Sequence, residues 1–141
     1  MAVLAHPDDE SLGFGGTLAR YSAEEVETYL ITATRGERGR FFSPDSKAEP
    51  AEVGRVREAE LRAAAAVLGI REVSILGYPD GAVDQIDAAT AIAAIVRRIR
   101  LVQPHVLPFW SFVYALVKHQ DSQRHRLTSR SGFSPCAVTG V

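Results

Sequence analysis

Three acidic side chains follow a histidine near the start of the chain. His6 and Pro7 are followed directly by Asp8, Asp9 and Glu10. Neighbouring carboxylates repel one another unless a cation neutralises them, and imidazole with carboxylate suits zinc and tolerates other divalent ions. One carboxylate can bind a metal while its neighbour activates a water molecule for attack on a carbonyl. The residues therefore predict a divalent-metal site for hydrolysis, and the alternative is a solvated turn with an acidic helix cap.

The order of apolar and polar residues predicts strands that alternate with helices. Strands are expected over residues 1–5, 27–34, 72–76 and 105–113, and helices over residues 17–23, 51–68 and 87–101. Such alternation is typical of βαβ units and a mostly parallel sheet. A length of 141 residues corresponds to a single domain. We therefore expect one α/β domain.

The polar segments that could position a site follow the predicted strands. Residues 6–16 are expected to form a loop, and residues 35–40 and 79–81 follow the second and third strands. In parallel sheets ligands bind at the carboxyl ends of the strands. We therefore expect these segments to converge on one edge of the sheet.

Composition excludes several classes of protein. A formal charge of −1 gives no reason to expect a nucleic-acid partner, and no apolar run is long enough for a membrane span. There is no pattern of a signal peptide, so the cytoplasm is the expected compartment. The single cysteine, Cys136, excludes an internal disulfide and a cysteine-rich zinc cluster. A metal would have to be bound by histidine and carboxylate.

The opening segment AHPDDESLGFGGTLARY resembles the signature of the LmbE-like (PIG-L-type) N-acetylglucosaminyl deacetylases. The resemblance continues in order through TRGERG, VREAELRAAAAVLGI and LGYPDG, and covers about residues 1–104. It implies a Rossmann-like three-layer fold and a zinc-dependent hydrolase. The implied substrate is a small molecule, an N-acetylglucosamine-type amino sugar or its conjugate, from which the enzyme removes acetyl. Nothing in the resemblance specifies the oligomeric state.

The resemblance also assigns roles to the acidic turn. It implies that His6 and Asp9 are ligands of Zn²⁺ or another divalent metal, and that Asp8 is the general base. Glu10 is expected to support these groups or to cap the following helix.

The same resemblance implies that two residues outside the turn contact the substrate. Arg57 would reach the sugar, with Glu60 three residues later as its orienting partner; the alternative is an exposed ion pair. Asp80 would accept hydrogen bonds from sugar hydroxyls, although Tyr-Pro-Asp-Gly at residues 78–81 is also an ordinary β-turn sequence.

The third metal ligand departs from the family's pattern. A catalytic zinc normally has three protein ligands, and the family's third comes from a later His-x-Asp-His motif. Here residues 119–122 read His-Gln-Asp-Ser, so Ser122 stands where the ligand is expected. His119 would keep the catalytic position, and His125 is the candidate replacement ligand. We accordingly expect a deacetylase core over residues 1–104 and a divergent or truncated C-terminal segment over residues 105–141.

Two other functions are compatible with the residues. A catalytically impaired relic of the family would bind a sugar or only fold. A nucleotide-binding α/β module would use the glycines at positions 13, 15 and 16, although the complete G-x-G-x-x-G pattern is absent.

Overall fold

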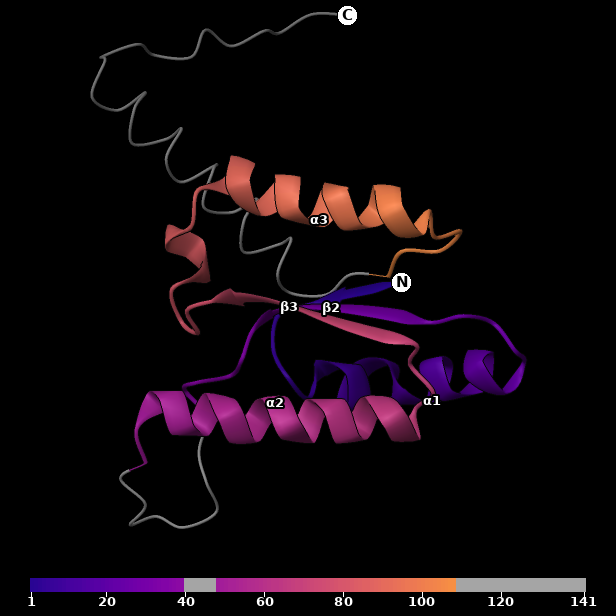
Figure 1. Cartoon of the computed structure of the whole chain (residues 1–141), viewed down its shortest axis with the longest axis horizontal. Helices are drawn as coiled ribbons and strands as arrows, with labels where there is room; N and C mark the ends of the chain where they lie inside the picture. The colour runs from indigo at the N-terminus through magenta and orange to yellow at the C-terminus, as the bar shows by residue number, and fades with distance from the viewer. Residues whose placement is uncertain (40–47, 109–141) are drawn as a thin grey trace, which may run out of the picture.

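The computed structural model describes residues 1–39 and 48–108, which form an α/β fold in three layers. The elements are β1 Ala2–Leu4, α1 Asp9–Ala23, β2 Tyr29–Thr34, α2 Pro50–Val67, β3 Glu72–Tyr78, the short 3₁₀ helix η1 Val83–Gln85 and α3 Ala88–Val102. The parallel sheet has the order β1-β2-β3, with Ala2 opposite Leu30 and Tyr29 opposite Glu72. Helices α1 and α2 cover one face and α3 covers the other (Figure 1). The predicted Rossmann-like α/β class is confirmed.

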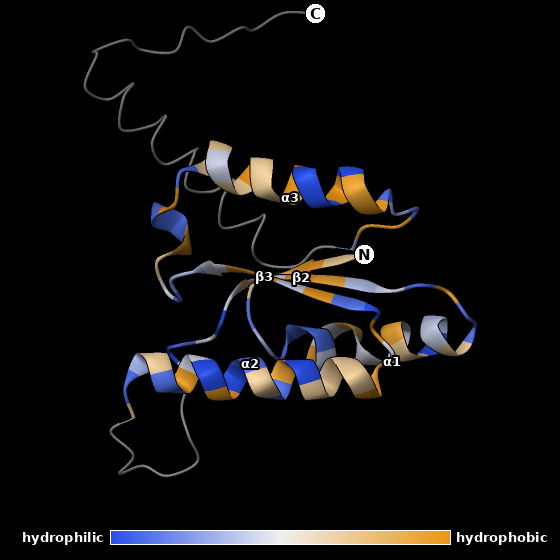
Figure 2. Ribbon diagram, viewed as in Figure 1, coloured by the Kyte–Doolittle hydropathy of each residue, from blue (hydrophilic) through white to orange (hydrophobic). Residues whose placement is uncertain are grey.

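The first two strands are almost entirely buried on both faces because each face is covered by helices. Successive side chains of a strand point to opposite faces. The core beneath α3 consists of Val3, Ala5, Ile31, Ala33, Ala91 and Ile95. The core beneath α1 and α2 consists of Ala2, Leu4, Leu18, Leu30, Leu61, Ala65 and Ile70. Figure 2 shows apolar residues along much of the sheet and both apolar and polar residues on each helix. Within the described ranges, no helix is both long and apolar enough to cross a membrane.

Two helix ends are capped by residues of their own local sequence. At the start of α3, the Asp87 carboxylate accepts hydrogen bonds from the hydroxyl and the backbone N–H of Thr90, at 2.7 and 2.9 Å. These bonds, chiefly the one from the hydroxyl, hold the pKa of Asp87 below its ordinary value. After α2, Gly69 adopts a positive φ of 67°, which is the usual conformation of a glycine that ends a helix.

The first helix begins earlier than its composition suggests. Residues 6–16 were expected to form a loop, but α1 starts at Asp9. Each glycine inside a helix costs about 1 kcal/mol relative to alanine. In α1 this cost is offset by acidic residues in the first turn, which stabilise a helix N-terminus, and by the burial of Glu10 and Leu18. The glycines at positions 13, 15 and 16 therefore lie inside the helix. They do not form the phosphate-binding loop that the nucleotide-binding alternative requires.

The segment after α3 runs beside β1, on the edge opposite β2. The Val3 N–H donates to the Pro108 carbonyl oxygen at 3.0 Å, and the amino group of Met1 donates to the Val106 carbonyl oxygen at 3.0 Å. The part of the predicted fourth strand over residues 105–108 is nevertheless not a regular strand. Pro108 has no N–H to donate to a ladder. The remaining part, residues 109–113, lies outside the described residues.

Candidate active site

The loops that follow the three strands contact one another at the carboxyl edge of the sheet. A side-chain carbon at Gly36 would lie 3.3 Å from Cδ of Pro7, so the first two loops are in close contact. The Arg38 N–H donates to Oδ2 of Asp80 at 2.9 Å, which joins the second loop to the third. Nε2 of His6 lies 3.3 Å from Oδ1 of Asp80. The predicted convergence of these segments is confirmed.

The Asp9 carboxylate is held beside His6 by the backbone. Its Oδ2 accepts hydrogen bonds from the N–H groups of Ala5 and His6, at 3.2 and 3.0 Å. The same oxygen lies 3.8 Å from Nδ1 of His6. The side chains of His6 and Asp9 are 42% and 24% exposed, so both are accessible to solvent. The structure therefore brings together the two residues that the sequence pairs as metal ligands.

This pair of side chains fits a zinc ion as two of its ligands. Two ligand atoms of one tetrahedral zinc, each about 2.1 Å from the ion, are about 3.4 Å apart. The separation of 3.8 Å between His6 and Asp9 is close to that value. Within residues 1–39 and 48–108, no group of three His, Cys, Asp or Glu side chains could hold a metal. A third ligand from this chain would lie outside this part, as do His119 and His125.

The turn before α1 is held by a buried carboxylate. Asp8 has a positive φ of 103°, a conformation that is uncommon for a residue with a side chain. Its N–H donates to Oε2 of Glu10 at 3.0 Å, and the Ser11 hydroxyl donates to Oε1 of Glu10 at 2.6 Å. Glu10 is only 2% exposed. Glu10 therefore supports the turn, in agreement with the role expected from the sequence.

Replacing Glu10 with Ala is expected to lower the free energy of unfolding by about 1–3 kcal/mol, because the N–H of Asp8 loses its partner in a partly buried site. Urea denaturation measures this change. The control is Glu24→Ala, which removes an exposed ion pair with Arg20 and should cost less than about 1 kcal/mol. A loss for Glu10→Ala no larger than that of the control would contradict the supporting role.

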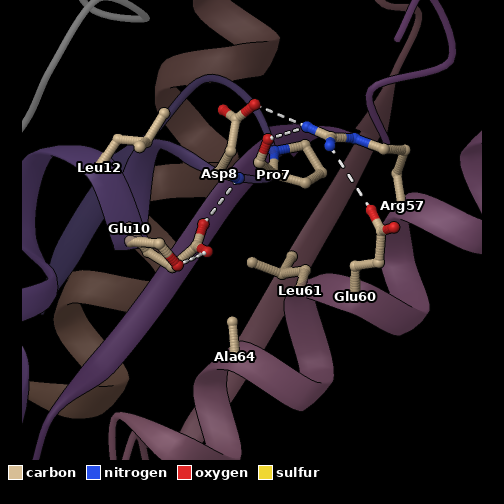
Figure 3. Close-up of a pocket in the computed structure, with 9 residues that line it drawn as sticks. Pro7, Asp8, Glu10, Leu12, Arg57, Glu60, Leu61 and Ala64 are labelled. Atoms are coloured by element: carbon tan, nitrogen blue, oxygen red, sulfur yellow. Dashed lines mark hydrogen bonds and ion pairs between the residues drawn. The ribbon is translucent and has the colours of Figure 1, made fainter. Parts of the chain in front are cut away.

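Arg57 connects helix α2 to the same turn. Its NH2 group donates to the Pro7 carbonyl oxygen and to Oδ2 of Asp8, both at 2.7 Å, as Figure 3 shows. Its NH1 lies 3.5 Å from Oε2 of Glu60, so the predicted partner is present but at a longer distance. The Arg57 side chain is 27% exposed. The sequence did not indicate the contact with Asp8, because 49 residues separate the two.

A cavity of about 230 Å³ lies between the start of α1 and helix α2. In Figure 3 the Asp8–Arg57 pair lies at one side, and Leu61 and Ala64 lie at the other. Its lining residues are Pro7, Asp8, Glu10, Ser11, Leu12, Arg57, Glu60, Leu61 and Ala64. The combination of apolar surface with a few charged groups is typical of a small-molecule site.

The structure gives protein partners to both carboxylate oxygens of Asp80. Oδ1 faces His6 and Oδ2 accepts the Arg38 N–H, and the side chain is only 11% exposed. The turn that carries it has Gly81 at a positive φ of 74°, and a side-chain carbon there would overlap the Arg38 guanidinium. The predicted role of Asp80 as a sugar contact did not anticipate these partners.

Comparison with known proteins identifies the family. Residues 1–134 match the family model described as PIG-L, GlcNAc-PI de-N-acetylase. The chain belongs to the PIG-L family. The family indicated by the ordered sequence blocks is thus confirmed.

One relative of this PIG-L chain comes from Acidothermus cellulolyticus and is named 1D-myo-inositol 2-acetamido-2-deoxy-alpha-D-glucopyranoside deacetylase. It is 35% identical over 151 residues, which cover 93% of this chain and 52% of the relative. Where relatives match most of the PIG-L chain, the chain spans about half of the relative's length.

Solved structures share the fold of the PIG-L chain. N,N'-diacetylchitobiose deacetylase from Pyrococcus horikoshii is 25% identical with a TM-score of 0.65, over 75% of this chain and 38% of that one. The 4-carboxy-2-hydroxymuconate hydratase GalB from Pseudomonas putida is 24% identical with a TM-score of 0.66, over 75% of this chain and 44% of that one. The second likeness shows the fold alone, so the reaction has to be inferred from the residues of the site.

Proposed function

We propose that this PIG-L chain is a metal-dependent hydrolase that removes acetyl from an N-acetylglucosamine-type amino sugar or conjugate. The observation that carries the proposal is the position of His6 and Asp9 side by side at the carboxyl end of β1, with Asp8 between them in sequence. The names of the relative from Acidothermus and of the chitobiose enzyme support the same reaction class.

His6 and Asp9 would hold the metal, with Zn²⁺ as the expected ion. When bound there, a divalent metal supplies a Lewis acid that polarises the acetyl carbonyl and lowers the pKa of a water molecule. The chain's part is to present one imidazole and one carboxylate in fixed positions. The two backbone N–H groups that bind Asp9 fix the carboxylate.

Asp8 would act as the general base. Its side chain is 48% exposed, so a water molecule can reach it. The Arg57 guanidinium binds Oδ2, and Oδ1 makes no hydrogen bond within the described residues. Oδ1 is therefore free to take the proton of the attacking water, and Arg57 orients the carboxylate while it does so.

Part of the substrate would occupy the cavity beside Asp8, while its acetyl group would extend past Asp8 to His6 and Asp9, which do not line the cavity. The cavity volume of about 230 Å³ is sufficient for one sugar ring, and Arg57 and Glu60 supply polar groups for hydroxyls at its edge. The relatives' names describe acetylated glucosamine joined to inositol or to a second sugar. We infer the same class of conjugate here.

Replacing Arg57 with Ala is expected to lower kcat/KM about 100-fold, because Asp8 loses its orienting contact. Arg57→Lys keeps the charge but cannot reproduce the contacts of the planar guanidinium, and should recover only part of the loss. The control is Arg55→Ala, which removes an exposed arginine from the same helix. Equal kcat/KM for wild type and Arg57→Ala, measured by release of free amine, would show that the contact has no role.

The proposed reaction is tested by supplying zinc and measuring free amine from two substrates, N-acetylglucosaminyl-inositol and N,N'-diacetylchitobiose. Amine release from at least one of them is the expected result. If neither yields amine although sugar binding is detected, the chain is a catalytically impaired relic, and the proposed hydrolase function is wrong.

A further inference from the structure

Asp80 lies between two parts of the site and faces both. The Arg38 N–H binds its Oδ2 at 2.9 Å, and Nε2 of His6 lies 3.3 Å from its Oδ1. The carboxylate is 11% exposed, whereas the imidazole that it faces is 42% exposed. The Asp80 carboxylate is more buried and is fixed by a backbone N–H. It can therefore orient the His6 imidazole.

The other nitrogen of His6 points towards Asp9. Nδ1 lies 3.8 Å from Oδ2 of Asp9, which is beyond hydrogen-bond distance. That oxygen already accepts two backbone N–H groups. A neutral imidazole carries a hydrogen on one nitrogen and a lone pair on the other. Because a carboxylate oxygen of Asp80 lies 3.3 Å from Nε2, we infer that the hydrogen is on Nε2 and the lone pair on Nδ1, next to Asp9.

We propose that Asp80 is a positioning residue, which orients the His6 ring and keeps its Nδ1 lone pair directed to the metal position shared with Asp9. Histidines that bind metals commonly donate their other N–H to a carboxylate, which fixes the ring and strengthens the ligand. The inference rests on the proposed function only in taking His6 as a metal ligand. The role of Asp80 as a sugar contact stays a separate prediction.

Zinc affinity tests this proposal without any turnover. Purified wild type and Asp80→Asn are titrated with zinc in competition with a chromophoric chelator. Asp80→Asn is expected to weaken zinc binding about 10–100-fold, because the neutral amide holds the imidazole N–H less strongly. The control is Asp84→Asn, the same chemical change at an exposed position of η1, which should leave the affinity within about twofold.

The tautomer of His6 is a second, independent readout. In long-range ¹H–¹⁵N spectra of the metal-free protein, we expect His6 of the wild type to carry its hydrogen on Nε2. Asp80→Ala should lose this preference, whereas Asp84→Ala should keep it. A wild-type His6 with its hydrogen on Nδ1 would overturn the proposal. If the wild type retains no zinc, the tautomer of His6 is the measurement that tests the proposal.

The outcomes separate this inference from the proposed function. Unchanged zinc affinity in Asp80→Asn, with a raised KM for the amino sugar, would overturn the positioning role and favour a sugar contact. Weakened zinc affinity together with no amine release by the wild type would support the positioning role and contradict the hydrolase.

Discussion

Replacing Asp8 with Asn is expected to lower the rate of amide hydrolysis by about 10²–10⁴-fold, the usual contribution of a general base. Asparagine has nearly the same shape but cannot take a proton from water. Its amide oxygen can still accept the Arg57 NH2 group, which binds Asp8 at 2.7 Å. Asparagine is also among the residues that best tolerate the positive φ of 103° at this position. The fold should therefore be retained.

The measurement for Asp8→Asn is kcat/KM for amine release, with zinc affinity and urea denaturation of the same sample. Asp84→Asn is the matched control, because it makes the same change at an exposed site. We expect full stability and near wild-type zinc affinity with most of the activity lost. A variant that keeps the wild-type rate would show that Asp8 is not the base.

Replacing His6 with Ala is expected to reduce zinc affinity by more than about 100-fold, beyond the loss typical of a supporting residue. His6 and Asp9 are the two residues proposed to share an ion, and Ala removes one of the two. Amine release should fall with the bound metal. Metal content after dialysis against zinc measures the effect.

A second histidine provides the control for this substitution. His105 is exposed and follows α3. His105→Ala should retain the zinc of the wild type. If His6→Ala retains as much zinc as His105→Ala does, the metal is bound elsewhere, and the assignment of His6 as a ligand is wrong.

The fold was largely predictable because its strands and helices follow from local patterns. The apolar run before His6 and the β-branched run ending at Thr34 predict strands, and the alanine-rich α2 ends at Val67, shortly before Gly69. A parallel sheet then places the loops after its strands at one edge. The position of His6, Asp8 and Asp9 at that edge follows from the sequence alone.

The start of α1 and the contacts around the acidic turn could not be predicted in this way. Local propensity opposed a helix through three glycines, and the helix forms because its buried face packs on the sheet and α2. The contact of Arg57 with Asp8 joins residues 49 apart, and the contact of Asp80 with His6 depends on the order of all three strands. No local sequence pattern predicts contacts between residues that are so far apart in the chain.

The most direct test of a metal-dependent hydrolase is the rate of amine release from the N-acetylated amino sugar, measured on one sample before chelation, after chelation and after zinc is restored. We predict that activity disappears with the chelator and returns with zinc. Activity that persists in the metal-free protein would contradict a metal site at His6 and Asp9 as the basis of the reaction.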